Sequence, residues 1–229
     1  MALPGVVRIE EAKVDSHEQL RFRMNNIYFY KLTADNGGAP CLRYGLLSLA
    51  ICKPIIRKTA KKGDLIFGFA ANSLHRDNRL LYVARVTKKL CDGDYYKNSR
   101  YARRLDCIYR LSGTRYVWKK NSAFHGPESV SHDLGRHPDY PRANVLLSRD
   151  FRYFGIAGTD QYKSRFPRVG RAVERLGRGA RVRHNEELRR ELIDMAHWLW
   201  RSASRKVIGQ PTSAPSRQIC LRGGSCAVV

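Results

Sequence analysis

The segment from Cys52 to Thr87 constrains the fold most, because it joins a short basic helix to two apolar strands. It reads CKPIIRKTAKKGDLIFGFA, then a polar loop, then RLLYVARVT. Pro54 suits the first helical position, where its missing N–H would have no partner, and Gly63 suits the left-handed residue that ends a helix. The segment therefore predicts a helix over 54–62 and buried strands over 65–70 and 80–87.

The charge of the chain indicates a polyanionic partner. It has 43 Lys+Arg against 20 Asp+Glu, a formal net charge of +23, which favours polyanions without distinguishing RNA, DNA and an anionic membrane. Five cations with no acid among them crowd the predicted helix, and we expect them to contact phosphates. They are Lys53, Arg57, Lys58, Lys61 and Lys62. The alternative is that this basic face is simply solvated.

Length and composition indicate one principal domain. With 229 residues and 43% hydrophobic content, the chain can bury one good core. No stretch approaches the roughly 20 apolar residues of a membrane helix, and the N-terminus lacks a signal-peptide pattern. The six cysteines show no metal-ligand spacing. We expect a cytoplasmic protein with reduced thiols, no membrane partner, no metal and no cofactor.

The order of predicted elements indicates an α+β fold. Further strands are expected at 27–33, 44–52, 107–111, 116–118, 144–148 and 151–155. The stretch 122–142 is expected to be a long loop, and 163–183 a basic connector. We divide the chain into an N-terminal extension (1–24), a core domain (25–160), a connector with a C-terminal helix (161–206) and a disordered tail (207–229).

The C-terminal helix has the clearest pattern. Asn185 is a good N-cap and is followed by Glu186 and Glu187, which favour a helix N-terminus. Apolar residues then recur at helical spacing, which predicts an amphipathic helix that docks on the core. They include Leu188, Leu192, Met195 and Leu199.

Several polar residues are candidates for a binding or catalytic site. Asp35 and Asn36 can hydrogen-bond a base edge, although both also suit a turn. Cys52, beside Lys53, is a candidate nucleophile, but a buried structural thiol is the more common outcome. The histidines and aspartates of the 122–142 loop have spacings that fit no metal motif; they are His125, His132, Asp133, His137 and Asp139. We assign no catalytic residue on this basis.

Three runs together resemble the nucleotide modification associated domain family, a group in the PUA-like superfamily. They are LSLAICKPIIRKTAKKGDLIFGFA, LLYVARVTKKL and NVLLSRDFRYFG, preceded by the turn DNGGAP. The resemblance covers roughly residues 26 to 200. It implies that the core domain is a small, curved PUA-like β-barrel flanked by helices. It also implies a system that installs or reads modified bases.

PUA-like readers receive a flipped-out base in a cleft between strands, while basic residues hold the flanking phosphates. Stacking is worth roughly 1 to 3 kcal/mol per base and extrusion costs a few kcal/mol, so phosphate contacts must help. We therefore expect a base-binding pocket lined by Asp35, Asn36, Cys52, Tyr153 and Phe154.

Three functions remain open from the sequence. The favoured one is a nucleic-acid-binding module, acting on DNA or RNA, that recognises a modified or flipped base and works beside a base-modification enzyme. The second is an enzyme acting on a nucleotide or modified base, with Asp35 or Cys52 as the reacting group. It is disfavoured because the chain has no Walker A loop, no GxGxxG and no zinc-deaminase signature. The third is a basic scaffold recruited through the 163–183 connector.

Overall fold

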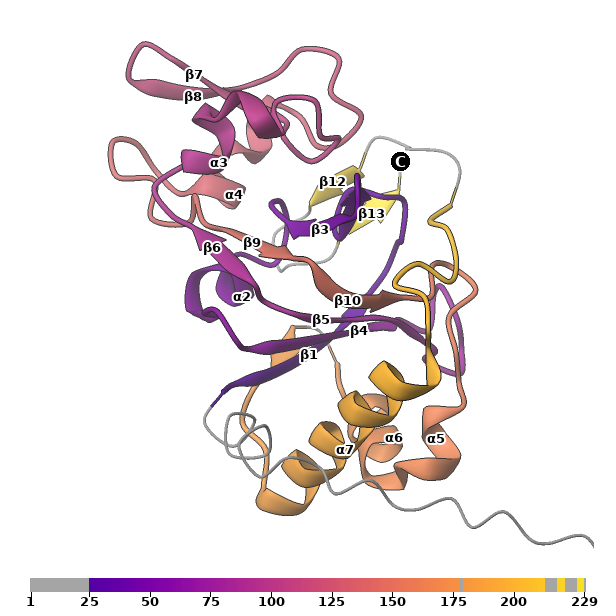
Figure 1. The fold of residues 1–229 in the computed structure, drawn as a ribbon. Coiled ribbons are helices and arrows are strands. Elements are labelled where there is room, and N and C mark those ends of the chain that lie inside the picture. The colour runs from indigo at the N-terminus through magenta and orange to yellow at the C-terminus, as the bar shows by residue number, and fades with distance from the viewer. Residues whose placement is uncertain (1–24, 178, 213–217, 221–225, 229) are drawn as a thin grey trace, which may run out of the picture.

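The computed structural model describes residues 25–177, 179–212, 218–220 and 226–228. Its centre is a mixed sheet with strand order β10-β5-β4-β1-β11, in which β1 and β4 are parallel and the other pairs antiparallel. The strands are β1 (Ile27–Leu32), β4 (Leu65–Ala70), β5 (Leu80–Arg85), β10 (Asp150–Tyr153) and β11 (Ala180–Arg181). Figure 1 shows this sheet in the middle of the molecule, between helices and a second group of strands.

One face of the central sheet is covered by helices. Because side chains alternate along a strand, Ile27 and Phe29 of β1 face the helices while Tyr28 and Tyr30 face the other way. The covering helices are α5 (Tyr162–Arg165), α6 (Pro167–Glu174) and α7 (Glu186–Ser202). The expected C-terminal helix is α7: the Asn185 side chain caps it by accepting from Leu188 N, and its apolar stripe is buried against the sheet.

The other face packs against a second sheet with order β2-β3-β9-β6. Its strands are β2 (Cys41–Arg43), β3 (Leu46–Leu49), β6 (Lys88–Leu90) and β9 (Val145–Ser148). Tyr44 and Gly45 both have positive φ and make the tight turn between β2 and β3. The expected single strand over 44–52 is therefore the second half of a hairpin, after which the chain turns into helix α2 (Pro54–Thr59).

A third hydrophobic cluster lies beyond the second sheet, built largely from tyrosines. It includes α3 (Asp94–Lys97), η1 (Ser99–Tyr101) and the ribbon of β7 (Tyr109–Ser112) with β8 (Arg115–Trp118). The expected loop over 122–142 contains η2 (Pro127–Ser129) and α4 (Val130–Leu134), because Phe124 and Leu134 anchor it in this cluster. A small hairpin pairs β12 (Gln218–Cys220) with β13 (Cys226–Val228).

The α+β class is confirmed, but the expected barrel is not. The described strands form separate sheets that stack in layers, and none of these sheets closes on itself. No helix in the described part of the chain combines the length and apolar character needed to cross a bilayer.

The C-terminal boundary also differs from expectation. Residues 207–212, expected to begin a disordered tail, run along β10: Val207 bridges Tyr153, and Ile208 N donates to Tyr153 O. Thr212 donates to the carbonyl of Asp35 through both its N–H and its hydroxyl. We call residues 207–212 the C-terminal strap. The expected N-terminal extension over 1–24, and the parts of the tail at 213–217, 221–225 and 229, lie outside the described residues.

Candidate functional site

Helix α2 is shorter than its sequence suggests. It begins at Pro54 as expected but ends at Thr59, because the Asp64 carboxylate accepts hydrogen bonds from Lys61 N and Asn26 N, both at 2.9 Å. These bonds fold the chain into a turn, in which Gly63 has the expected positive φ of 97°. Lys61 and Lys62 are therefore exposed residues of that turn and do not extend the helix.

Arg57 points inward, contrary to the prediction that it contacts phosphate. Its side chain is 0% exposed and donates to four backbone carbonyls at 2.7 to 2.9 Å. These belong to Cys52, Asp133, Arg142 and Asn144. Its guanidinium also lies 3.7 Å from the buried carboxylate of Asp133. Arg57 thus ties α2 to α4 and to the chain before β9, and we remove it from the set of phosphate contacts.

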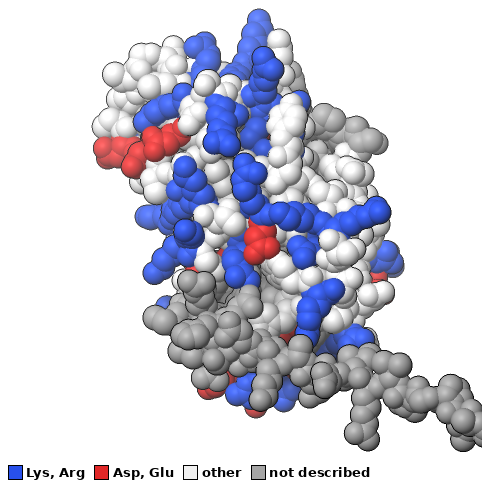
Figure 2. All heavy atoms as spheres, viewed as in Figure 1, with Lys and Arg blue, Asp and Glu red and all other residues white. Residues whose placement is uncertain are grey.

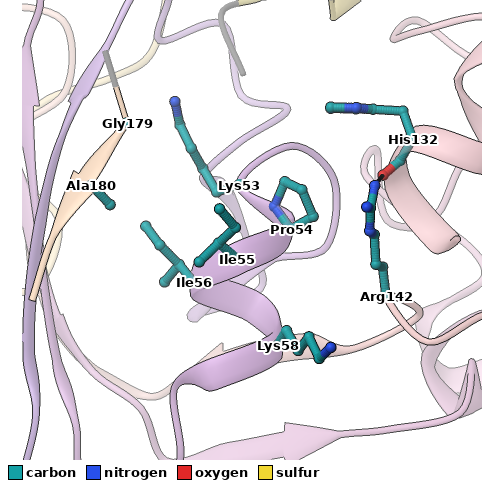
Figure 3. Close-up of a pocket in the computed structure, with 9 residues that line it drawn as sticks. All are labelled: Lys53, Pro54, Ile55, Ile56, Lys58, His132, Arg142, Gly179 and Ala180. Atoms are coloured by element: carbon teal, nitrogen blue, oxygen red, sulfur yellow. Dashed lines mark hydrogen bonds between the residues drawn. The ribbon is translucent and has the colours of Figure 1, made fainter. Parts of the chain in front are cut away.

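Lys53 and Lys58 line a surface cavity of about 530 Å³ around α2. Figure 3 shows His132 and Arg142 on the side of Pro54, and Gly179 and Ala180 on the opposite side of the helix. The lining also contains Ile55 and Ile56. Ile55 is strongly exposed, at 74%. The cavity therefore combines an apolar helix surface with a cationic rim.

Cys52, two residues before this helix begins, contacts a histidine held by an aspartate. The Cys52 Sγ lies 3.3 Å from His125 Nε2, and His125 Nδ1 lies 2.7 Å from Asp133 Oδ2. Cys52 lies between β3 and α2, His125 lies in the loop after β8, and Asp133 lies in α4. Each is at most 3% exposed. This is the arrangement of a nucleophile, a base and a group that orients the base.

The Asp133 carboxylate is saturated with donors. It accepts from His125, from the Tyr109 hydroxyl at 2.7 Å and from Cys52 N at 2.9 Å, with Arg57 beside it. Burial alone would raise the pKa of Asp133, but the hydrogen bond and charge of His125, together with Arg57, lower it below its ordinary value. Asp133 is therefore a fixed negative charge at the centre of the network.

The charge on Asp133 controls the protonation of His125. Burial by itself would lower the pKa of His125, but its hydrogen bonds to Asp133 and Cys52 raise that pKa to about 10. The imidazole is consequently a cation at neutral pH, with an N–H on each ring nitrogen. One N–H faces the carboxylate of Asp133 and the other faces the sulfur of Cys52.

The backbone is strained at this network. Cys52, Lys53 and His125 have positive φ values of 56°, 42° and 56°, although none is glycine. Such conformations cost of order 1–3 kcal/mol each and concentrate at functional sites. The strain at Cys52 and Lys53 turns the chain sharply from the β3 segment into α2.

A second buried polar group lies between the two sheets. The Tyr153 hydroxyl donates to the Asp35 carboxylate, 2.8 Å from each oxygen, and Tyr30 and Tyr82 share a hydrogen bond of 2.8 Å. Burial raises the pKa of Tyr30 well above its ordinary value, with further contributions from Tyr82, Cys52 and Asp35. The Lys53 ammonium lies 4.9 Å from the centre of the Tyr30 ring, so the two polar groups are neighbours. Asn36 is also buried; its Oδ1 accepts from Gly38 N, while its Nδ2 has no hydrogen-bond partner.

A family model described as nucleotide modification associated domain 2 matches residues 24–218. The chain belongs to this family. Its match includes the C-terminal strap and so extends past the 26–200 span of the sequence resemblance. No curated protein and no solved structure was found to match the chain.

Membership of the nucleotide modification associated domain 2 family associates the chain with nucleotide modification. The family description names no site residues, so these are identified from the geometry. Of the five predicted base-pocket residues, Asp35, Asn36, Cys52 and Tyr153 are buried in the two neighbouring polar groups. Phe154 does not join them. It follows Tyr153 along the chain and packs with the helix-side cluster, because successive side chains of an extended segment point to opposite faces.

Sequence reasoning did not find the partners of Cys52 in this family member. In the sequence, His125 and Asp133 stand out only as candidate metal ligands, and within the described residues no group of three or more His, Cys, Asp or Glu side chains is placed to hold a metal ion. Their separation of 8 residues, with Cys52 73 residues earlier than His125, gives no local signal. Arg142 and His132, at the cavity rim, had no pattern of their own either.

Asp35 should make the stability of this protein depend on pH. Burial raises the pKa of Asp35 to about 6, although the hydrogen bond from Tyr153 lowers it in part. The folded protein then holds this proton between pH 3.8 and 6 while the unfolded chain releases it, so the contribution of Asp35 to stability falls as pH rises through this window. We expect Asp35→Asn to remove that fall and to stabilise the protein at pH 7.5 by about 1–3 kcal/mol.

Urea unfolding of Asp35→Asn and wild type at pH 4.5 and 7.5 measures this difference. The exposed Asp92→Asn serves as the control for general acid effects. Equal pH dependence of the stability of Asp35→Asn and wild type would contradict an unusually protonated Asp35.

Proposed function

We propose that this protein binds nucleic acid at the cavity around α2, as part of a system that modifies bases. One observation carries the proposal. Among the residues that the structure describes, the charged side chains that line this cavity are all cationic, namely Lys53, Lys58 and Arg142, with His132 beside them and no Asp or Glu. Figure 2 shows that Lys and Arg also far outnumber Asp and Glu on the face seen in Figure 1. Such a field attracts a polyanion and orients it toward the cavity.

The cavity suits a nucleotide with its phosphate. Its volume of about 530 Å³ lies within the range of small-molecule sites. Lys58 and Arg142 are exposed and can contact phosphate oxygens, and Arg142 offers the fork geometry that phosphates favour. Pro54 and Ile55 supply an apolar surface for the base. We therefore place the base here and not beside Asp35 and Tyr153, where the C-terminal strap covers the polar group.

Modified-base recognition is the finer part of this proposal. The family's association with nucleotide modification supports it, and a modified group would meet the apolar surface of Ile55 and Ile56. A base-modification enzyme is the partner we propose in the cell. The relationship to PUA-like readers remains a prediction from sequence.

Charge reversal at Lys58 tests the binding surface. We expect Lys58→Glu to weaken binding of a fluorescent single-stranded oligonucleotide about tenfold near 0.1 M salt, and to reduce the slope of log K against log salt by about 1. Arg110→Glu on β7 is the matched control, because Arg110 is also an exposed cation but does not line the cavity. Fluorescence anisotropy across a salt series, with DNA and RNA of matched sequence, measures both effects. Equal loss in the two variants would place the binding surface elsewhere.

The same titration tests base reading. Oligonucleotides carrying modified cytosine or adenine are compared with unmodified ones at increasing salt. We expect a preference for one modified oligonucleotide that persists at high salt, because contacts to a base do not release counterions. Binding that collapses equally for all oligonucleotides would leave only a phosphate-binding role.

A further inference from the structure

We infer that Cys52, His125 and Asp133 form an acyl-transfer site, in which Cys52 is the nucleophile, His125 the acid and base, and Asp133 the residue that positions His125. This activity goes beyond binding. Its substrate class, a carbonyl group attached to a nucleotide, rests on the proposed function, because the substrate would be held in the cationic cavity.

The contacts of the three residues match these roles. Sγ faces Nε2 at 3.3 Å, and Nδ1 faces the Asp133 carboxylate at 2.7 Å, so the same imidazole bridges the nucleophile and the carboxylate. Asp133 also accepts from the backbone N–H of Cys52, which fixes the nucleophile relative to the base. A histidine between a thiol and a carboxylate is the form in which cysteine nucleophiles are activated.

Two further observations indicate a site that serves more than packing. Cys52, Lys53 and His125 keep positive φ values at the place where the thiol and the imidazole meet. The ammonium of Lys53 lies 4.9 Å from the centre of the Tyr30 ring and interacts electrostatically with Cys52. A positive charge at this place stabilises the anion that forms when a carbonyl is attacked.

Residues that neighbour the network in the chain line the cavity. Lys53 and Pro54, the two residues after Cys52, belong to its lining. His132, which precedes Asp133, lines the other side, and its Nε2 is buried without a hydrogen-bond partner. Cys52 and Asp133 thus each stand directly beside a lining residue in the chain, although neither is itself part of the lining.

The reaction proceeds in two balanced steps. The Cys52 thiolate attacks the carbonyl carbon, a carbon–sulfur bond forms, and the bond to the leaving group breaks as His125 gives that group its Nε2 proton. Water or an amine then attacks the thioester while Nε2 takes its proton, the carbon–sulfur bond breaks, and the thiolate beside protonated His125 is restored. No oxidant, reductant or metal is consumed. The net result is hydrolysis of the acyl group or its transfer to an amine.

Alkylation of the wild-type protein by iodoacetamide tests the nucleophile directly. Cys91 is exposed and serves as an internal control in the same sample. We expect Cys52 to be alkylated at least about tenfold faster than Cys91 at pH 6, because a histidine next to a cysteine sulfur activates it as a nucleophile and His125 Nε2 lies 3.3 Å from Cys52 Sγ. Peptide mapping by mass spectrometry gives both rates. Alkylation of Cys91 while Cys52 stays unmodified in the folded protein overturns the inference.

Acyl transfer is tested with p-nitrophenyl acetate. We expect a burst of p-nitrophenol and an acetyl adduct on Cys52, both absent in Cys52→Ser and reduced at least about 100-fold in His125→Asn. A folded wild-type protein that releases p-nitrophenol no faster than Cys52→Ser also overturns the inference. Because these measurements use the wild-type protein as well as the variants, a variant that fails to fold does not decide the outcome.

Measuring oligonucleotide binding beside acyl-adduct formation distinguishes the acyl-transfer site from the proposed binding function. Oligonucleotide binding by Cys52→Ser is measured by anisotropy under the conditions used for Lys58→Glu. Retained binding with no acyl adduct in wild type rejects the acyl-transfer site and keeps the binding function. An acyl adduct without any nucleic-acid binding keeps the catalytic site and rejects a nucleotide as its substrate.

Discussion

Replacing Arg57 by alanine is expected to lower the free energy of unfolding by about 3–5 kcal/mol, although Arg57 reads as a surface cation in the sequence. The substitution removes four hydrogen bonds to backbone carbonyls and leaves the buried Asp133 with His125 but without the guanidinium of Arg57. Each carbonyl that loses its donor in the interior costs about 1–3 kcal/mol, less whatever relaxation recovers.

Urea unfolding followed by tyrosine and tryptophan fluorescence measures this loss. Lys58→Ala is the matched control, because Lys58 follows Arg57 directly but is exposed, and we expect it to change stability by less than about 0.5 kcal/mol. Similar stability of Arg57→Ala and Lys58→Ala would mean that Arg57 does not hold α2 to the 133–144 segment.

Asp133→Asn is expected to change both the stability of the protein and its dependence on pH. The raised pKa of His125 means that the folded protein keeps a proton that the unfolded chain loses above about pH 6.5. The stabilisation is therefore complete below pH 6.5 and is lost as pH rises through about 10. Without the carboxylate, His125 should lose its proton at lower pH and this dependence should flatten.

We expect wild type to lose stability by up to about 1.4 kcal/mol per pH unit from this group between pH 7 and 9.5, and Asp133→Asn to lose little. The variant should also be less stable at pH 6.5 by about 3 kcal/mol, because Arg57, Tyr109 and His125 lose a charged partner. Urea midpoints at three pH values measure both effects, with the exposed Asp139→Asn as control. Parallel pH profiles for wild type and Asp133→Asn would show that Asp133 does not set the charge of His125.

The local elements were predictable from sequence where one residue decides the structure. Pro54 marked the start of α2, Asn185 capped α7, and the continuous apolar and aromatic runs of β1, β4 and β5 marked the strands of the central sheet. The same local reasoning placed Cys52, Lys53 and Lys58 near one another, because they are close in sequence. The family was also evident, since its motifs are contiguous runs.

The parts that sequence reasoning missed depend on contacts between distant segments. Arg57 has the same composition cues as Lys58, and only the position of carbonyls from residues 133 to 144 makes one buried and the other exposed. His125 and Asp133 reach Cys52 from a segment whose polar composition predicts a loop. The expected barrel is absent for a related reason. The pattern of a strand predicts which side chains share a face, but β9 pairs with β3 and β6 in a separate sheet through contacts between residues far apart in the sequence.

The C-terminal strap has a consequence for how the protein can be cut. A fragment ending at residue 206, the natural limit if the tail were dispensable, would strip the backbone partners from Tyr153 and Asp35 and admit water to that carboxylate. Its pKa should then move back toward that of an ordinary aspartate. The C-terminal strap thus shields from water the carboxylate of Asp35, which lies in the loop after β1. In a shortened protein, measurements would therefore reflect an Asp35 carboxylate exposed to water. Measurements of this domain should use chains that extend past Thr212.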